Sequence, residues 1–281
     1  MLLGMNMLLW TTHATREHNH IYQRLRDGGF DGVEIPLSQA GPSHFDDLGR
    51  CLNEVGLQRT AVYAPPPEAC PVQMESGIRS AAADRFTWAI DCAASLGAAM
   101  LCGPFHTSYK YFTGQPPTES QLESSAEILH GAAEYAQTRG IHLAVEPLNR
   151  FECFLMNTVG QARAMVDKVG HPALGILYDT HHAHIEEKNI PDAIAIGGER
   201  IIHVHASEND RGAPGTGQVD WQANFHALKE TGYDDWLTIE AFSPTSDEEF
   251  AAAIHLWREC IHEDEIFDHV AAFIRRTWDA A

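Results

Sequence analysis

The sequence is poor in positive charge and contains no long apolar run. It has 19 lysine and arginine residues against 39 aspartate and glutamate residues, which gives a formal net charge of −20 at pH 7. Nucleic-acid binding depends on lysine and arginine neutralising phosphates, so this composition argues against a nucleic-acid partner. No stretch reaches the roughly 18 consecutive apolar residues of a membrane-spanning helix. We therefore expect a cytoplasmic protein that handles small, neutral ligands and binds no membrane.

Two further absences narrow the class of protein. The six cysteines are scattered without any CxxC pair, so neither a structural zinc module nor a disulfide scaffold is predicted, and we expect free thiols. The apolar N-terminus, MLLGMNMLLW, lacks the basic leading segment and the small-residue cleavage site of an export signal. We interpret it as a buried strand.

Short apolar runs recur along the whole chain, with helix-like stretches between them. Ser76–Leu96 carries apolar residues at three- and four-residue spacing, which predicts a helix with one buried stripe. Glycines in EVGLQ, SLGAA, TRGIH and KETGY stand where a helix would end just before a strand. The predicted strands are Met5–Trp10, Gly32–Leu37, Arg59–Ala64, Ala99–Phe105, His142–Leu148, Gly175–Asp179, Ile201–Ala206 and Trp236–Phe242.

Eight strands that alternate with helices favour a (β/α)8 TIM barrel over an open doubly wound sheet. A nucleotide-binding open sheet would carry a glycine-rich loop such as GxGxxG after its first strand, and MLLWTTHAT has none. No linker-like stretch interrupts the pattern, so we expect residues 1–281 to form a single domain. Glu263–Trp278 is predicted to be an additional C-terminal helix.

Four polar residues stand at the ends of four separate predicted strands. Glu146 ends HLAVE, Asp179 ends GILYD, His205 ends IIHVH and Glu240 ends WLTIE. The catalytic groups of a barrel come from the C-terminal ends of its strands, which face one mouth. Taken singly, each residue could instead cap a helix or form an ion pair. Four together favour one divalent cation, with Mn²⁺ expected first and Mg²⁺ or Co²⁺ as alternatives.

Several motifs in the C-terminal half carry a family resemblance. The segments are AVEPLNRFE, YDTHHAHIEE, HVHASENDRG followed by GTGQVDW, and TIEAF. Together they resemble the ketose 3-epimerases of the D-tagatose/D-psicose 3-epimerase type, which belong to the xylose-isomerase-like TIM barrels. The similarity is weaker before residue 140, where mainly the alternation of predicted strands and helices agrees with the family.

The resemblance implies roles for individual residues. Glu146, Asp179, His205 and Glu240 match the metal ligands of the family, and Glu146 and Glu240 also match its two catalytic acid/base residues. The positions that match substrate-binding residues, which would hold the ketose near O1 to O3, are Glu152, His182 and Arg211. The run His181-His182-Ala183-His184 departs from the family pattern and leaves the choice of His182 over its neighbours open. No other cofactor is implied.

The expected reaction is proton transfer at C3 of a free ketohexose or ketopentose through a cis-enediolate. Inversion needs a base on each face of that plane, which two glutamates on different strands could provide. The same layout would serve an aldose-ketose isomerase or an inosose-type isomerase or dehydratase, and both stay open. A barrel nuclease would need ligands for several zinc ions and a basic groove, and the net charge of −20 argues against this class. The partner expected is therefore a small sugar, bound by a homodimer or homotetramer.

Other residues have weaker signals. His203 lies two residues before His205 and should point the same way one layer deeper, so we expect a buried, hydrogen-bonded histidine. Glu34 could bind a substrate hydroxyl or a neighbouring strand end. Aromatic or polar residues that could line the mouth are Trp10, His13, Tyr63 and the loop 106–117, which could equally fill the core, lie on the surface or form a subunit contact.

Overall fold

The computed structural model describes residues 1–38, 40–244 and 248–281. Within these ranges eight parallel strands pair in chain order and close into a barrel, with β1 hydrogen-bonded to β8. The strands are β1 (Leu2–Asn6), β2 (Gly32–Pro36), β3 (Gln58–Val62), β4 (Met100–Gly103), β5 (His142–Val145), β6 (Leu174–Asp179), β7 (Ile201–Ala206) and β8 (Trp236–Ile239). The predicted TIM barrel is confirmed.

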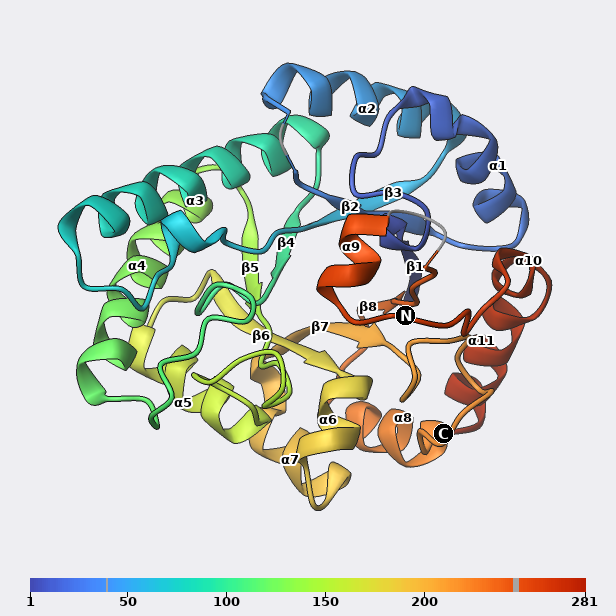
Figure 1. The fold of residues 1–281 in the computed structure, drawn as a ribbon. Coiled ribbons are helices and arrows are strands. Elements are labelled where there is room, and N and C mark those ends of the chain that lie inside the picture. Colours follow the sequence, from blue (N-terminus) through green and yellow to red (C-terminus); the bar gives the residue numbers. More distant parts are fainter. Residues whose placement is uncertain (39, 245–247) are drawn as a thin grey trace.

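Helices surround this barrel and join consecutive strands (Figure 1). Those of the ring are α1 (Asn19–Asp27), α2 (Pro42–Val55), α3 (Ser76–Leu96), α4 (Glu119–Thr138), α5 (Val159–Val169), α6 (Thr180–Glu186), α7 (Ile190–Gly197) and α8 (Trp221–Glu230). The predicted helix Ser76–Leu96 matches α3 at both ends. The glycines of the four predicted helix stops all have positive φ. No helix within the described ranges is both long and apolar enough to cross a bilayer.

The C-terminal segment forms the additional helix that the sequence predicts. It begins with α10 (Glu263–Glu265), passes through a π-helical turn at Ile266–Val270 and continues as α11 (Ala271–Ala280). The ring of Trp278 packs edge-on against Phe225 of α8, with centroids 5.5 Å apart. This contact fixes the helix on the outside of the barrel, where Figure 1 shows it beside α8.

The first strand was predicted too late in the chain. The sequence pattern indicates Met5–Trp10, whereas β1 covers Leu2–Asn6 and a 3₁₀ turn follows at Met7–Leu9. The Asn6 side chain accepts a hydrogen bond from the Leu8 N–H and so begins that turn. Met7 and Leu9 are nevertheless buried. Apolar residues therefore continue past the end of β1, so hydrophobicity alone places this strand too late in the chain.

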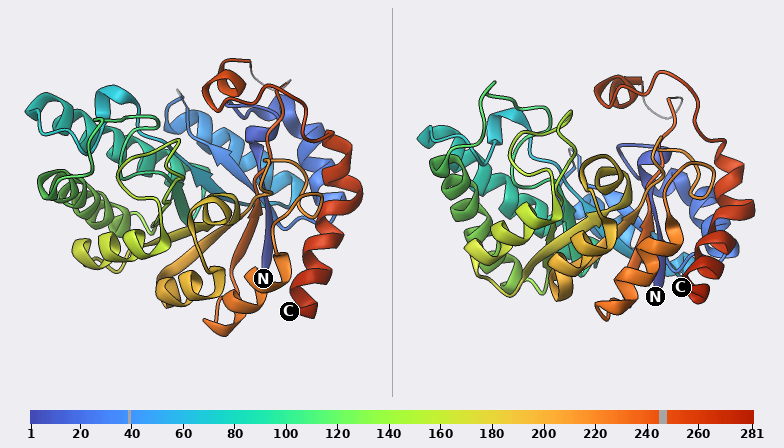
Figure 2. Two further views of the ribbon diagram at one scale, coloured as in Figure 1. Left: turned by 60° about the horizontal axis from the view of Figure 1, so that its bottom comes forward. Right: turned by 90° about the horizontal axis from the view of Figure 1, so that it is seen from below.

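One helix lies over the end of the barrel where the strands finish. This is α9 (Glu248–Ala253), which belongs to the long segment after β8. Figure 2 shows α9 at the end of the barrel opposite the N- and C-termini. In a parallel barrel this is the end at which side chains from several strands can meet.

Candidate metal centre and active site

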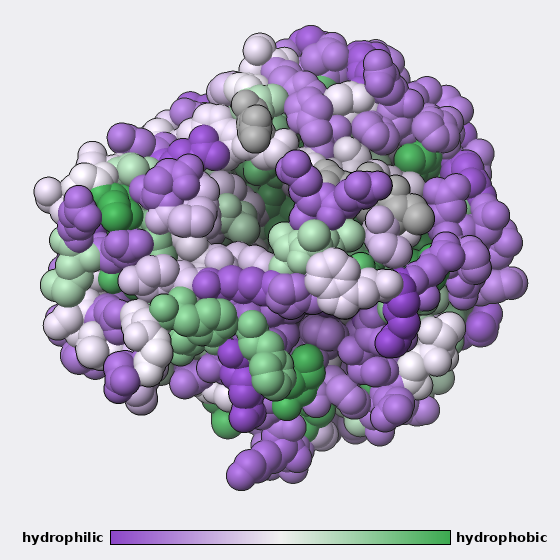
Figure 3. Space-filling model, in the orientation of Figure 1, coloured by the Kyte–Doolittle hydropathy of each residue, from purple (hydrophilic) through white to green (hydrophobic). Residues whose placement is uncertain are grey.

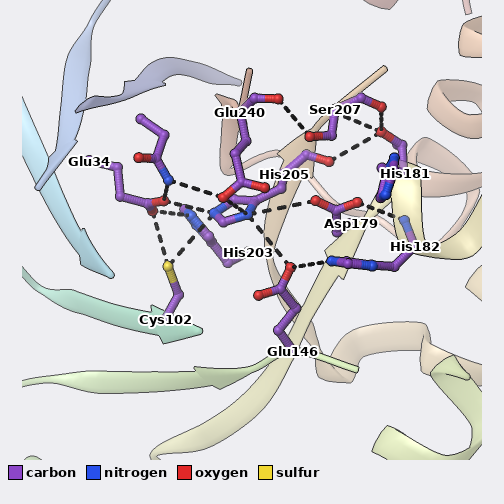
Figure 4. Close-up of polar contacts among 12 residues, drawn as sticks. Glu34, Cys102, Glu146, Asp179, His181, His182, His203, His205, Ser207 and Glu240 are labelled. Carbon is purple, nitrogen blue, oxygen red and sulfur yellow. Dashed lines mark hydrogen bonds and ion pairs between the residues drawn. The ribbon is translucent and has the colours of Figure 1, made fainter. Parts of the chain in front are cut away.

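The four predicted metal ligands come together at the mouth of the barrel. Donor atoms of Glu146, Asp179, His205 and Glu240 all lie within 4.8 Å of one another (Figure 4). Asp179 is the last residue of β6 and His205 lies in β7, while Glu146 and Glu240 directly follow β5 and β8. All four are buried. Four consecutive strands therefore direct three carboxylates and one imidazole to a single point.

The imidazole of His205 is oriented for ligation. Its Nε2 lies 2.7 Å from Oε1 of Glu34, and its Nδ1 faces the carboxylates, 3.5 Å from Glu240 Oε1. Glu146 Oε1 and Asp179 Oδ2 each lie 3.8 Å from the same nitrogen. Nδ1 is buried and makes no hydrogen bond to any residue that the structure describes. An unpartnered nitrogen among three carboxylate groups fits a divalent cation with mixed oxygen and nitrogen ligands.

The electrostatics of the cluster also favour a cation. Burial raises the pKa of Glu146 well above its ordinary value, and the charges of Glu240 and Asp179 raise it further. Burial and the charge of Glu240 likewise raise the pKa of Asp179. Burial works in the same direction on Glu240, but His205 and Arg211 outweigh it and lower its pKa. The carboxylates thus repel one another, only part of this repulsion is offset by His205 and Arg211, and a bound divalent ion would relieve the rest.

Arg211 reaches two of the predicted metal ligands. Its Nη1 donates to Glu240 Oε2 at 2.7 Å and to Asp179 Oδ2 at 3.1 Å. It also donates to Ser207 Oγ at 2.7 Å. Residue 211 has a φ of 65°, a left-handed conformation that is uncommon for arginine. The loop after β7 therefore holds this side chain over the centre through a strained backbone.

His182 and Glu152 complete the predicted substrate-binding group. Nδ1 of His182 accepts from the Asn149 N–H at 3.1 Å. Its Nε2 lies 3.6 Å from Glu146 Oε1 and 4.0 Å from Glu152 Oε2, and Nη2 of Arg211 lies 2.9 Å from the same nitrogen. The polar atoms of His182, Arg211 and Glu152 thus lie close together beside Glu146, where they could bind the oxygens of a small ligand.

The position of His181 supports His182 as the better candidate. Nδ1 of His181 lies 3.0 Å from the carbonyl oxygen of Asn209 and 3.2 Å from that of Glu208. Both contacts are to the loop after β7. The ring of His181 therefore holds this loop against α6, while the ring of His182 faces Glu146.

Glu208 anchors the loop that carries Arg211, a function that sequence reasoning missed. Its Oε1 accepts from the Val219 N–H at 3.0 Å, and its Oε2 accepts from the Gly215 N–H at 2.8 Å and from Trp221 Nε1 at 3.1 Å. The Glu208 side chain is fully buried. Burial would raise its pKa, but these hydrogen bonds lower it below the ordinary value. The segment GTGQVDW is thereby folded back around one ionised carboxylate.

A cavity of about 540 Å³ opens above the cluster. Its floor is polar and includes Glu146, Glu152, His182, Arg211 and Glu240. Its walls are mostly apolar and are lined by Leu8, Val62, Pro104, Leu148, Phe242, Phe250, Ile254, Leu256 and Trp257. The hollow near the centre of Figure 3 has a largely apolar interior. A small polar ligand can therefore place its reacting end on the cluster and its far end against apolar surface.

The residues with weaker sequence signals lie in the cavity wall, in the core or at the surface. Within the loop 106–117, Tyr109 lines the cavity. Lys110 of this loop reaches the segment after α9, with Nζ 2.7 Å from His255 Nε2.

Tyr63 is buried and packs edge-on against Phe86. Trp10 donates to Glu263. The ring of His13 stacks on His44 at the surface pocket beside α2.

His203 is the buried, hydrogen-bonded histidine that the sequence predicts. Its Nε2 lies 2.8 Å from Oε2 of Glu34, and both residues are fully buried. Of the two expectations for Glu34, a substrate hydroxyl or a neighbouring strand end, the structure supports the second. Sequence reasoning did not find Asn6, whose Nδ2 contacts both Glu34 and Glu240.

Known proteins resemble this chain over nearly its full length. The family model described as "Xylose isomerase-like TIM barrel" matches residues 22–263. The ketose 3-epimerase of Arthrobacter globiformis is 31% identical over 278 residues, which cover 98% of this chain and 96% of that protein. A probable ketose 3-epimerase of Synechocystis sp. is 29% identical over 288 residues, with 98% and 96% covered. The structure of D-allulose 3-epimerase from Methylomonas sp. in complex with D-allulose superposes with a TM-score of 0.92 at 26% identity, covering 99% of this chain and 97% of that one.

Proposed function

This chain belongs to the xylose isomerase-like TIM barrel family, and from that premise we propose that it is a metal-dependent ketose 3-epimerase. It is an enzyme of the isomerase class, as its relatives named ketose 3-epimerases are. The proposed substrate is a free ketohexose or ketopentose. The observation that carries the proposal is the pair of glutamates, Glu146 and Glu240, which approach one buried centre from different strands with His205 and Asp179 between them.

The residues proposed to hold the metal are Glu146, Asp179, His205 and Glu240. The unpartnered Nδ1 of His205 and the mutual repulsion of the three carboxylates support this assignment. Oxygen-rich sets with one imidazole suit Mn²⁺ first, with Mg²⁺ and Co²⁺ as alternatives. When bound, such an ion supplies Lewis-acid polarisation of the C2 carbonyl, which makes the neighbouring C3 proton more acidic.

The two glutamates are the proposed acid and base. One carboxylate removes the proton from C3 and leaves an enediolate at C2 and C3. The other carboxylate, protonated beforehand, returns a proton to C3 from the opposite face, so the configuration at C3 inverts. A single base could return the proton only to the face from which it came. The positions of Glu146 after β5 and Glu240 after β8 suit this division of work.

His182, Arg211 and Glu152 are proposed to bind the sugar. The ring of His182 and the guanidinium of Arg211 lie together at the cavity floor and would bind oxygens beside the reacting carbon. Glu152 lies at the same floor, 4.0 Å from His182, and would accept from a substrate hydroxyl. These contacts hold C3 between the two glutamates while the apolar walls exclude water.

Isotope exchange tests this function. The metal-loaded enzyme is incubated in D₂O with a panel of ketoses that includes L-ribulose and D-tagatose, and the products are analysed by NMR. The proposal expects deuterium at C3 and accumulation of the C3 epimer. Deuterium at C1 together with an aldose product would show an aldose-ketose isomerase instead. Turnover of an inosose alone, with no exchange into any ketose, would favour the inosose-type isomerase or dehydratase.

A further inference from the structure

Glu34 lies at the centre of a buried hydrogen-bond network below the proposed metal centre. The network contains groups from β1, β2, β3, β4 and β7. Figure 4 shows Cys102, His203 and His205 around Glu34. Oε1 of Glu34 accepts from His205 Nε2 at 2.7 Å and from Asn6 Nδ2 at 3.0 Å. Oε2 accepts from Thr60 Oγ1 at 2.8 Å, His203 Nε2 at 2.8 Å and Cys102 Sγ at 3.1 Å. Its two oxygens are thus occupied by donors, and Glu34 has no part in binding substrate.

Oε1 of Glu34 determines which nitrogen of His205 faces the carboxylates. A carboxylate 2.7 Å from Nε2 can only accept, so the proton of a neutral ring resides on Nε2. The lone pair is then on Nδ1, the nitrogen directed at Glu146, Asp179 and Glu240. With the opposite tautomer, Nδ1 would carry a proton and could not ligate a cation.

Asn6 links the same carboxylate to a proposed catalytic residue. Its Oδ1 accepts from the Leu8 N–H, so the amide group has only one possible orientation. In that orientation Nδ2 donates to Glu34 Oε1 at 3.0 Å and to Glu240 Oε1 at 3.2 Å. Without this donor, Glu34 and Glu240 would each lose a hydrogen bond in a buried site.

We infer that Glu34 and Asn6 are positioning residues of this site, where Glu34 fixes the tautomer and direction of His205 and Asn6 fixes Glu240. The inference rests on the proposed function, because it assigns these residues to the same centre. Outer partners of a ligating histidine change metal affinity, commonly by about 10–100-fold when they are removed. Glu34 is therefore expected to act mainly on metal affinity, and Asn6 mainly on turnover.

The test compares Glu34→Gln with the matched control Thr60→Val. Thr60 donates to the other oxygen of the same carboxylate, and within the described ranges no hydrogen bond joins it to His205. Mn²⁺ affinity of the folded protein is measured by the EPR signal of free Mn²⁺, and the melting temperature of the metal-free protein is recorded beside it. We expect Glu34→Gln to weaken Mn²⁺ binding by about 10–100-fold. Thr60→Val should bind Mn²⁺ as the unaltered protein does.

Asn6→Ser provides a second variant in case Glu34→Gln does not fold. A serine hydroxyl can still accept from the Leu8 N–H, but it is too short to bridge Glu34 and Glu240. At saturating Mn²⁺, kcat is expected to fall by about tenfold or more, as for a misplaced acid/base group, while KM changes little. An unchanged kcat would overturn the assignment of Asn6.

The outcomes separate this inference from the proposed function. Equal losses of melting temperature in Glu34→Gln and Thr60→Val, with Mn²⁺ affinity unchanged in both, would show a purely structural network and overturn the inference alone. If the unaltered protein binds Mn²⁺ and Glu34→Gln weakens it, but no ketose is epimerised, the inference stands and the proposed function fails. Failure of the unaltered protein to bind Mn²⁺ would overturn both.

Discussion

Arg211 donates from Nη1 to Oε2 of Glu240 across 2.7 Å. A side chain proposed to bind the substrate is therefore held directly by a proposed acid/base residue. The same Nη1 reaches Asp179, so the guanidinium fixes the relative positions of two carboxylates. Loss of its planar, forked geometry should affect both substrate binding and the placement of Glu240.

Arg211→Lys should lower kcat/KM by about 10–100-fold, because the lysine ammonium keeps the charge but cannot reach Asp179, Glu240 and a substrate oxygen together. Steady-state kinetics with an accepted ketose measure this. The control is Arg200→Lys, in the 3₁₀ turn just before β7 and outside the cavity lining. Wild-type kcat/KM in Arg211→Lys would contradict the proposed role.

The glutamates can be tested one at a time. Glu146→Gln and Glu240→Gln should each lower kcat by about 10²–10⁴-fold, because an amide can neither accept nor deliver the C3 proton. Each assay is run at saturating metal, so that weaker metal binding does not account for the loss. Glu199→Gln, at an exposed position, should keep full activity. Activity within a factor of two in either active-site variant would remove that residue from the mechanism.

Glu208 should stabilise the fold in a pH-dependent way. Its pKa is lowered in the folded state, so its contribution is fully present above the unfolded value of about 4.3 and is lost as the pH falls through the folded pKa. Glu208→Gln should reduce the free energy of unfolding by about 1.5–3 kcal/mol at pH 7. The difference from the unaltered protein should shrink below about pH 4. Urea unfolding of the metal-free proteins across this range measures it, and a difference independent of pH would contradict the account.

Gly103 at the end of β4 allows close approach of two strands. Its φ is 136°, and a Cβ placed there would lie 2.2 Å from the carbonyl oxygen of Tyr63. Gly103→Ala should therefore destabilise the protein by several kcal/mol or prevent folding. Gly56→Ala is the matched control, because Gly56 has a φ of 89° but open space around it. Its cost should be about 1 kcal/mol. Similar thermal unfolding of both variants would show that the contact at Gly103 is not restrictive.

Local sequence patterns could predict most of the frame and the proposed ligands. Asp179 and His205 lie inside strands, and each buried run ends in a polar residue that a barrel must direct to its mouth. The pairing of His205 with Glu34 could not be predicted, because it joins residues 171 positions apart through barrel closure. The end of β1 was misplaced since Met7 and Leu9 are as apolar as strand residues but pack in a turn. The wrapping of the loop around Glu208 depends on backbone donors, which no side-chain pattern reveals.

The central claim is that one divalent ion is held by Glu146, Asp179, His205 and Glu240. Anomalous diffraction from crystals soaked in Mn²⁺ and recorded at the manganese absorption edge tests it most directly. The account predicts one strong anomalous peak among these four side chains, at bonding distance from Nδ1 of His205. A peak elsewhere, or no peak at this mouth in crystals exposed to saturating Mn²⁺, would contradict it.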